Sequence, residues 1–267
     1  MVVDQKRCSQ QVLEVKAVSL GLGKQSILAD VNLCVNSGEC LAVVGPNGAG
    51  KSSLFRVISG EWPHYHGKIY FNQRELQLWT LAQLARMRAV MPQNSSLSFP
   101  YTVAEVVMLG RLPHSSGQKK DREICQQVMT MCDVAQFAER SYLQLSGGER
   151  QRVQLARVLA QIWTPVDEGP RVLLLDEPTS ALDLSHQLAL MEMVKQVAQA
   201  QVAVVIILHD LNLAARFADR IMVMHQGAVD ALGTPEEVMV PQRIRRVFGV
   251  DANVIPHPEH QCPLIVY

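Results

Sequence analysis

The octapeptide GPNGAGKS, residues 45–52, constrains the fold of this chain more than any other stretch. It follows an apolar run, residues 41–44, that has the length of a buried strand. It precedes residues 53–58, whose apolar positions recur at helical spacing. A strand, a glycine-rich turn and a helix in this order form the context of a phosphate-binding loop. The sequence therefore predicts a phosphate site in an α/β fold, and we call residues 45–52 the phosphate loop.

Each residue type in the phosphate loop suits the binding of phosphate. Glycine permits backbone angles that a Cβ forbids and brings amide N–H groups close to phosphate oxygens. The N-terminus of the following helix adds unpaired donors. We expect Lys51 to reach the β- and γ-phosphates of a nucleotide and the Ser52 hydroxyl to bind Mg²⁺. The expected nucleotide contacts here are Gly45, Pro46, Asn47, Gly48, Ala49, Gly50, Lys51, Ser52 and Ser53.

The order of strand and helix signals predicts two β layers and a helical insertion. Strand patterns at residues 12–20, 27–35 and 67–72 suggest an antiparallel β layer, with a turn at residues 21–24. Residues 93–162 carry mainly helical spacing. Strand signals return at residues 172–175, 202–208 and 221–224, with helical stretches at 187–200 and 214–219 between them. Strands that alternate with helices indicate a parallel sheet covered on both faces.

Two carboxylates follow the apolar run VLLL, at Asp176 and Glu177. Ligands of open α/β sheets collect at the carboxyl ends of the strands. We expect Asp176 to hold Mg²⁺, directly or through water, and Glu177 to act as general base on an attacking water. The alternative is an acidic strand end that only caps a turn.

The pentapeptide LSGGE, residues 145–149, precedes a predicted helix at residues 150–159, and we call it the signature segment. Taken alone, it could be an ordinary helix N-cap in which Ser146 accepts backbone hydrogen bonds. Two glycines at a helix N-terminus also make an anion-binding nest. Both interpretations stay open at this level.

Composition and charge give no support to several other classes of function. Lys plus Arg and Asp plus Glu are 25 each, so the formal net charge is zero and gives no argument for binding nucleic acid. No run of 18 apolar residues occurs, so we expect no transmembrane helix. The six cysteines form no C-x-x-C pair, and we expect reduced thiols. Cys125 and Cys132 lie two turns apart on one predicted helix face, which suggests packing.

Taken together, the motifs resemble the ATP-binding subunit of an ABC transporter. They are GPNGAGKS, Gln93, LSGGE, LLLDE, Ser180-Ala181-Leu182-Asp183 and His209, in the order and spacing of that family. The resemblance covers about residues 12–240. The implied fold class is α/β, a P-loop NTPase with a RecA-like parallel sheet, an N-terminal antiparallel β layer and a helical insertion. The implied domain spans residues 12–245, with a helical subdomain at about 94–162, followed by a C-terminal tail at 246–267.

The resemblance also implies roles for residues outside the phosphate loop. Gln93 would contact Mg²⁺ or the attacking water, so the implied metal contacts are Ser52, Gln93 and Asp176. His209 would contact the γ-phosphate and orient the water, and the implied catalytic residues are Glu177, His209 and Gln93. The remaining implied nucleotide contacts are Ser146, Gly147, Gly148 and Asp183. The family usually stacks an aromatic ring on adenine, whereas the aligned position here is Leu22, which weakens stacking.

The implied mechanism is a clamp made of two copies. Each ATP would lie between the phosphate loop of one copy and the signature segment of the other, and hydrolysis would release the clamp. The implied partners are a second copy, an integral-membrane permease dimer and a periplasmic substrate-binding protein. The implied location is the cytoplasmic face of the cell membrane, as a peripheral subunit.

Three segments favour import of an iron chelate. Residues 98–103 and 107–111 resemble the ATPases of siderophore, cobalamin and haem importers. The extended link at residues 162–170 and the tail, with His257 and His260, resemble haemin-import subunits. We expect haemin, with cobalamin or a ferric siderophore as alternatives. A soluble ABC ATPase without a permease, or a nucleotide-dependent regulatory module, is the alternative from another class. We expect the histidines His64, His66, His257 and His260 to be exposed and not to bind haem.

Overall fold

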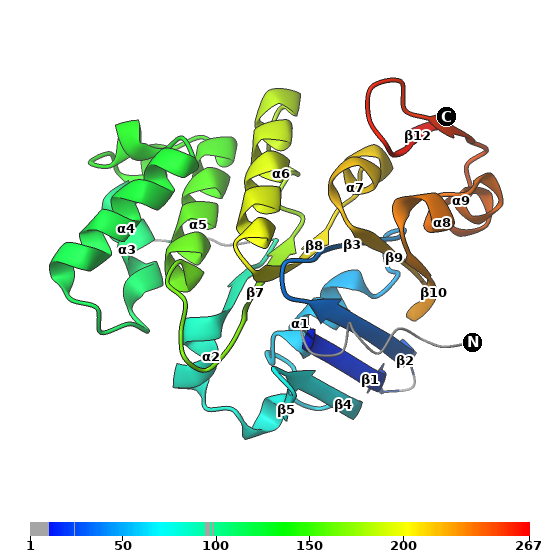
Figure 1. Cartoon of the computed structure of the whole chain (residues 1–267), viewed down its shortest axis with the longest axis horizontal. Helices are drawn as coiled ribbons and strands as arrows, with labels where there is room; N and C mark the ends of the chain where they lie inside the picture. Colours follow the sequence, from blue (N-terminus) through cyan, green and yellow to red (C-terminus); the bar gives the residue numbers. More distant parts are fainter. Residues whose placement is uncertain (1–10, 24, 94–96, 98) are drawn as a thin grey trace.

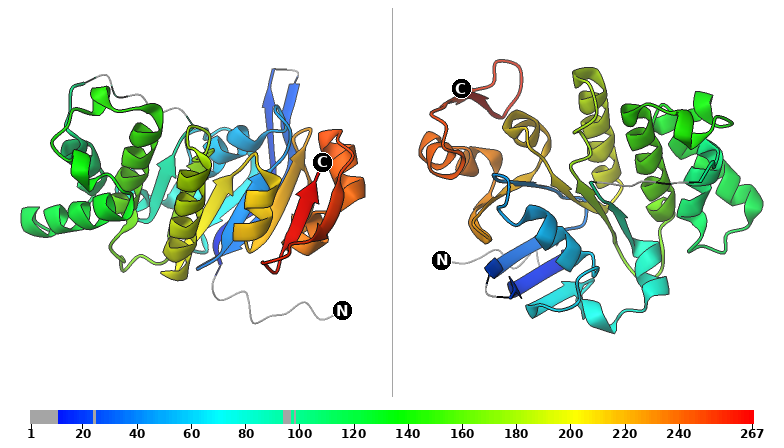
Figure 2. Two further views of the ribbon diagram at one scale, coloured as in Figure 1. Left: turned by 90° about the horizontal axis from the view of Figure 1, so that it is seen from above. Right: turned by 180° about the vertical axis from the view of Figure 1, so that it is seen from behind.

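The computed structural model describes residues 11–23, 25–93, 97 and 99–267, and its fold is α/β (Figure 1). A six-stranded sheet lies between a four-stranded antiparallel β layer on one side and helices on the other (Figures 1 and 2). The helices of the predicted insertion gather at the end of the molecule opposite the C-terminus. The predicted fold class is confirmed.

The antiparallel layer has the strand order β2-β1-β4-β5. Its strands are β1 (Gln11–Leu22), β2 (Gln25–Asn36), β4 (His66–Phe71) and β5 (Arg74–Glu75). The turn predicted at residues 21–24 is too long, because Gly21 pairs with Ser26 and Leu22 pairs with Gln25 in the sheet. The strands therefore continue almost to the tip of the hairpin.

The central sheet has the order β10-β9-β3-β8-β7-β6. Its strands are β3 (Cys40–Val44), β6 (Arg88–Met91), β7 (Arg171–Asp176), β8 (Val202–Ile207), β9 (Arg220–His225) and β10 (Ala228–Gly233). The first five pair in parallel, as predicted, and β10 pairs antiparallel with β9. Strand β10 escaped prediction because its residues are all half-buried, so its sequence has no clear alternation.

Alternate residues of the sheet belong to two separate cores. In β7, Leu173 and Leu175 face the core formed with the helical insertion. Val172 and Leu174 face the core formed with the antiparallel layer. All the residues of β8 are buried, and they alternate between the same two cores. Because successive side chains of a strand point to opposite faces, Asp176 must lie on the same face as Val172 and Leu174.

The described helices fall into three groups. Helices α1 (Lys51–Ile58) and α2 (Leu81–Met87) contribute to the core with the antiparallel layer. The insertion consists of α3 (Val103–Met108), α4 (Gln118–Met131) and α5 (Gly147–Ile162). The third group is α6 (Leu184–Gln199), α7 (Leu211–Phe217), α8 (Pro235–Val238) and α9 (Pro241–Phe248). Helix α6 begins three residues before the predicted stretch, and α7 begins three residues early and ends two residues early.

None of the helices in the described part of the chain is both long and apolar enough to cross a membrane. Cys125, in the middle of α4, and Cys132, at its C-terminal end, are both buried, and their sulfurs contact those of Met108 and Met193 respectively. Burial raises the pKa of the Cys125 thiol to about 11 and that of Cys132 to about 12. Their predicted role in packing is confirmed.

The long link between α5 and β7 folds back onto the antiparallel layer. Glu168 pairs with Arg86 of α2, and Asn72 Nδ2 donates to the Pro170 carbonyl oxygen over 3.0 Å. The link closes on itself through a bridge between Val166 and Gly169. It is therefore an ordered part of the domain and joins α2 to the end of β4.

The C-terminal tail forms a hairpin, β11 (Asn253–Pro256) and β12 (Pro263–Val266), that packs on α7. The Asn212 side chain pairs with the backbone of Ile265, accepting from its N–H over 2.8 Å and donating to its carbonyl over 3.1 Å. The Ile265 side chain is buried in the larger core. The tail thus braces α7, the helix that starts two residues after His209.

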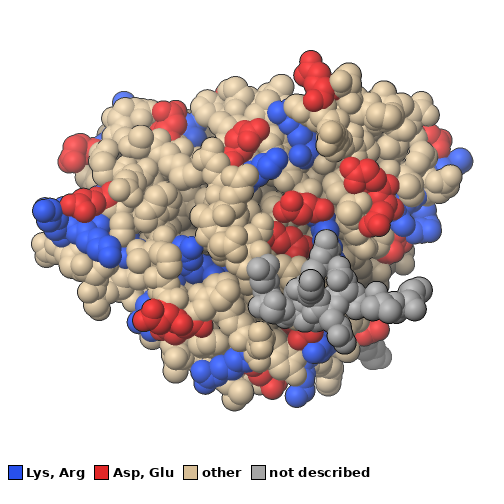
Figure 3. Space-filling view, viewed as in Figure 1, with Lys and Arg blue, Asp and Glu red and all other residues tan. Residues whose placement is uncertain are grey.

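The predicted exposure of the histidines is confirmed for two of the four residues. His64 and His66 are exposed, as expected. His257 and His260 are half-buried, because their rings stack with centroids 4.5 Å apart and His257 Nδ1 accepts backbone N–H groups across the hairpin turn. In the space-filling view, acidic and basic side chains are interspersed across one face (Figure 3). That distribution agrees with the zero formal net charge.

The contact between Asn212 and Ile265 predicts that its removal lowers the protection of β12 amides from hydrogen exchange. Asn212→Ala removes two hydrogen bonds to Ile265, each contributing about 1 kcal/mol, so β12 amides should exchange with solvent roughly 30-fold faster. Native-state hydrogen exchange measures this rate, with the amides of β8 in the same sample as the internal control. Equal protection of β12 in the variant would show that the hairpin does not depend on this contact.

Candidate functional site

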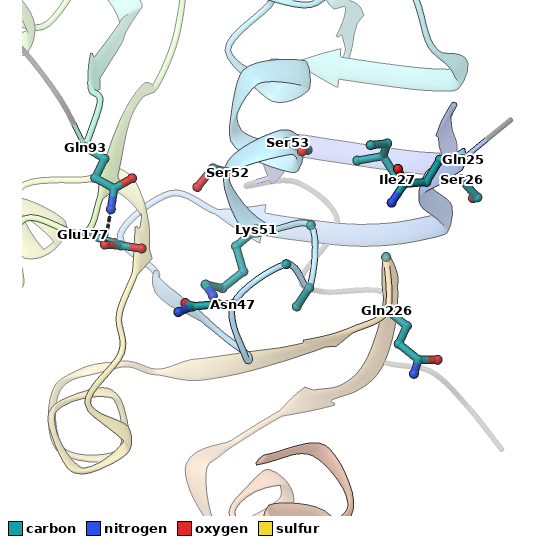
Figure 4. A pocket seen from close by; sticks show the side chains of 14 residues that line it. Gln25, Ser26, Ile27, Asn47, Lys51, Ser52, Ser53, Gln93, Glu177 and Gln226 are labelled. Carbon is teal, nitrogen blue, oxygen red and sulfur yellow. Dashed lines mark hydrogen bonds between the residues drawn. The ribbon is translucent and has the colours of Figure 1, made fainter. Parts of the chain in front are cut away.

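Four adjacent parallel strands deliver the predicted site residues to one edge of the sheet. The order β3-β8-β7-β6 places four segments side by side at the carboxyl ends. Gly45 follows β3, His209 comes two residues after β8, Glu177 follows β7, and Gln93 comes two residues after β6. Figure 4 shows Gln93 joined to Glu177 on one side of the cavity that results. The structure therefore brings Gln93 and His209 into contact with Glu177, at the edge where the phosphate loop begins.

The backbone of the phosphate loop requires glycine at two positions. Gly45 has φ +154°, and a Cβ there would clash with the Met224 carbonyl of β9. Gly50 is the N-cap of α1 and has φ +98° in the left-handed region, where a side chain is strained. The loop can therefore pass closely over β9 and turn directly into α1.

Lys51 is buried and folds back over the loop. Its Nζ donates to the carbonyl oxygens of Gly45, over 2.7 Å, and Pro46, over 3.1 Å. Burial lowers the pKa of Lys51, although the negative charges of Glu177 and Asp176 act in the opposite direction. The ammonium group thus lies between the loop and the two acidic residues, where a phosphate would meet it.

Asp176 is 8% exposed and lies beside the start of α1. Burial raises the pKa of its carboxyl, and the neighbouring Glu177 raises it further. A hydrogen bond from Ser52 and the charge of Lys51 act against that rise. Asp176 Oδ1 is buried and has no hydrogen-bond partner among the described residues. A carboxylate with an unpaired oxygen beside a hydroxyl is the ligand set that Mg²⁺ prefers, so these residues fit a magnesium ion.

Glu177 is held by a neighbour at each carboxylate oxygen. Oε1 lies 2.6 Å from His209 Nε2, and Oε2 accepts from Gln93 Nε2 over 2.6 Å. The backbone of Glu177 has φ +53°, a left-handed conformation that is uncommon for a residue with a side chain. Such outliers persist where the surrounding structure determines them, and they cluster at functional sites.

The signature segment lies outside this cavity. Ser146 is the N-cap of α5 and forms a capping box with Glu149, so its side chain oxygen accepts from the Glu149 N–H over 3.3 Å. In return, the Ser146 N–H donates to Glu149 Oε2 over 2.7 Å, and hydrogen bonds from the Ser146 side chain and backbone lower the pKa of the Glu149 carboxyl. Ser146 and Gly147 are exposed and Gly148 is half-buried. The structure therefore does not bring these residues to the phosphate loop of the same chain.

Asp183 also lies away from the cavity and caps a helix. It is the N-cap of α6 and accepts from the His186 backbone N–H over 3.0 Å and from Ser185 Oγ over 2.9 Å. The hydrogen bonds from His186 and Ser185 lower the pKa of Asp183 to about 2. Asp183 is therefore a charged, exposed carboxylate near the signature segment.

Sequence reasoning missed part of the cavity wall. The cavity has a volume of about 760 Å³. It is lined by Gln25, Ser26, Ile27, Asn47, Gly48, Ala49, Gly50, Lys51, Ser52, Ser53, Gln93, Glu177, Gln226 and Gly227. The missed residues are Gln25, Ser26 and Ile27 of β2 and the β9–β10 turn at 226–227, opposite Glu177 (Figure 4). The sequence Gln226-Gly227 suggests a turn. Its place beside the phosphate loop depends on hydrogen bonds of Gly227 with Ala29 and Ala49, which are distant in the sequence. The side chain of Leu22, the predicted adenine contact, lies outside the described residues.

Sequence comparisons give close relatives over nearly the whole chain. A family model described as ABC transporter matches residues 28–180. The hemin import ATP-binding protein HmuV of Pseudomonas entomophila is 49% identical over 255 residues, which are 96% of this chain and 99% of that protein. The protein of the same name from Gloeobacter violaceus is 46% identical over 257 residues, 96% of this chain and 94% of that protein.

Solved structures share the fold. The chain superimposes on a metal-chelate type ABC transporter in an inward-facing conformation with a TM-score of 0.78 and 24% identity, covering 96% of this chain and 97% of that one. A dimeric bacterial ABC transporter cassette gives a TM-score of 0.72 and 27% identity, covering 83% of this chain and 98% of that one.

The raised pKa of Asp176 predicts a gain in stability when its charge is removed. A carboxyl whose folded pKa is raised stabilises the fold only while it is protonated, and that contribution is lost as the pH rises through the folded pKa. Asp176→Asn should therefore raise the melting temperature of the nucleotide-free protein, in chelator at pH 7, by about 2–4 °C, equivalent to about 1 kcal/mol.

The matched control is Asp251→Asn, which removes an exposed carboxylate from the tail. The gain from Asp176→Asn should shrink as the pH falls, because the native Asp176 becomes protonated at a higher pH than an ordinary Asp carboxyl, and Asp251→Asn should show no such gain. A lower melting temperature for Asp176→Asn at pH 7 would contradict the assignment of a disfavoured charge. Thermal scans across this pH range by circular dichroism measure both effects.

Proposed function

This chain belongs to the ABC transporter family as an ATP-binding subunit, and we propose that it hydrolyses ATP to drive haemin import through a membrane permease. The observation that carries the proposal is the convergence of four strand ends on Glu177. There a carboxylate lies against His209 and Gln93 in the same cavity as the phosphate loop. The near full-length match to proteins named for hemin import supports the choice of substrate.

In the proposed reaction the phosphate loop holds the β- and γ-phosphates, and Lys51 turns from its own loop carbonyls toward them. Ser52 and Asp176 would hold Mg²⁺, with Gln93 nearby, and the ion would neutralise charge on the phosphate oxygens. Glu177 accepts a proton from the attacking water. His209 and Gln93, which now bond the Glu177 carboxylate, are placed to orient that water and the γ-phosphate. Catalysis then rests on positioning and charge stabilisation.

We infer that the exposed signature segment completes the site of a second copy. Ser146, Gly147 and Gly148 lie at the N-terminus of α5, outside the cavity of their own chain, and the charged Asp183 lies close by. The helix N-terminus gives this segment free amide donors suited to a phosphate. A solved cassette of the same fold is described as dimeric, which supports the arrangement.

The permease is an integral-membrane dimer, and this chain binds it as a peripheral subunit at the cytoplasmic face of the cell membrane. A periplasmic protein delivers the substrate. Haemin is favoured over cobalamin and ferric siderophores because the relatives named above are hemin import proteins.

The proposed substrate can be tested by transport. Vesicles that contain a candidate haemin permease and this chain should take up haemin only when ATP is present, whereas cobalamin and a ferric siderophore should not accumulate. Glu177→Gln in the same vesicles is the control for ATP hydrolysis. ATP-dependent uptake of cobalamin or siderophore in place of haemin would overturn the substrate assignment, and full ATPase activity without any permease binding would favour a soluble ATPase.

The proposed base and the dimer can be tested together. Glu177→Gln should lower kcat by about 10²–10⁴-fold, since it removes a general base, while ATP binding persists and an ATP-bound dimer accumulates. Adding Ser146→Arg should abolish that dimer by blocking the second copy. Ser146→Ala is the matched control, because it loses the same helix cap, at a cost of about 1 kcal/mol, without adding bulk.

Size-exclusion chromatography with light scattering measures the dimer, and phosphate release measures kcat. Parent-like turnover of Glu177→Gln would refute the base assignment. A dimer that persists with Ser146→Arg would refute the role of the signature segment across the interface.

A further inference from the structure

We propose that Gln151 is a positioning residue that transmits the position of the signature helix α5 to Glu177 of the same chain. The inference rests on the proposed function, because it needs α5 to contact the nucleotide of a second copy. It adds a physical connection between the two ATP sites of the dimer, one that passes through a single amide side chain.

Both polar atoms of the Gln151 side-chain amide form hydrogen bonds with the segment that carries Glu177. Its Nε2 donates to the Glu177 carbonyl oxygen over 3.2 Å. Its Oε1 accepts from the Ala181 N–H over 3.3 Å. Gln151 lies five residues after the N-cap Ser146, in the second turn of α5. The side chain therefore spans the turn between Glu177 and Ala181 and fixes both of its ends to the helix.

The conformation of Glu177 depends on this turn. Its φ of +53° is disfavoured for a residue with a Cβ, so neighbouring contacts must stabilise it. The Glu177 carbonyl accepts from the Ser180 N–H over 3.3 Å and from Ser180 Oγ over 3.1 Å, in addition to Gln151. Rotation of this peptide would move the carboxylate away from Gln93 and His209. Gln151 is the member of this set that comes from another element of the fold.

The N-terminus of α5 packs directly on the same turn. A Cβ at Gly148 would lie 3.2 Å from the Ala181 carbonyl oxygen and 3.3 Å from Leu182 Cδ2. Asp183 follows at once as the N-cap of α6. A shift of α5 toward a nucleotide held by the second copy must therefore move the turn at residues 177–181, and Gln151 carries that shift to the Glu177 backbone.

The attachment of α5 to the rest of the domain does not need Gln151. Its buried face includes Val153, Leu155 and Leu159 of the larger core. Gln154 Nε2 donates a hydrogen bond to the Tyr142 hydroxyl over 2.9 Å. Gln161 Nε2 donates to the backbone carbonyls of Ala85, over 2.7 Å, and Arg88, over 3.0 Å. Loss of the Gln151 contacts should accordingly affect the site and leave the helix in place.

The test compares two glutamines on the same helix. Gln151→Met keeps the length of the side chain and removes both hydrogen bonds, so kcat for ATP hydrolysis should fall about 10- to 100-fold while KM for ATP stays within twofold. The Hill coefficient of hydrolysis should drop toward one, because the two sites lose their connection. Gln161→Met, which removes two bonds to backbone carbonyls far from Glu177, should keep parent kcat and Hill coefficient.

A second variant separates the two bonds of the amide. Gln151→Glu retains an acceptor for Ala181 and loses the donor to Glu177, and it should lose as much kcat as Gln151→Met. In the Glu177→Gln background, Gln151→Met should still form the ATP-bound dimer, since binding does not require the base. Parent kcat in Gln151→Met, or an equal loss in Gln161→Met, overturns the proposal. An inactive parent chain overturns the proposed function itself, and this inference with it.

Discussion

The parallel register of β3, β8, β7 and β6 is the constraint on which the rest of the site depends. These strands end at one edge of the sheet, so residues that lie far apart in the chain, from Gly45 to His209, become neighbours. The register also decides which face each side chain occupies. Asp176 lies with the core that contains α1, and this brings its carboxylate to Ser52 and Lys51. The chemistry of the site thus follows from strand pairing, and loops only complete it.

The site residues restrain one another as closely as core residues do. Both oxygens of the Glu177 carboxylate are engaged, Lys51 is folded onto its own loop, and Ser146 and Asp183 cap helices. The contacts of Glu177 and Lys51 satisfy charged groups that burial would otherwise leave unpaired, and the caps satisfy backbone N–H groups at the starts of α5 and α6. Nucleotide binding must exchange several of these contacts for new ones. In this structure the reactive groups are therefore held by hydrogen bonds to other groups of the protein.

Sequence alone predicts the parts of this protein that local patterns encode. The phosphate loop, the strands before Asp176 and His209 and the buried helix faces all follow from glycine spacing and apolar periodicity. Ile27, Gln226 and the tail hairpin do not, because their places depend on contacts between distant segments, such as the Gly227 bonds to Ala29 and Ala49 and the pairing of Asn212 with Ile265. The positive φ of Glu177 is similarly hidden, since no residue type at that position announces it.

Strand β7 has a further consequence for how the protein can change over evolution. Its apolar residues alternate between two cores of similar character, and each core could accept another aliphatic side chain of similar volume at most of these positions. Insertion or deletion of one residue in β7 is different. It would exchange the faces of Asp176 and Glu177, and the acid beside Ser52 would point into the opposite layer. The site consequently sets a stricter requirement on the length of this strand than on its composition.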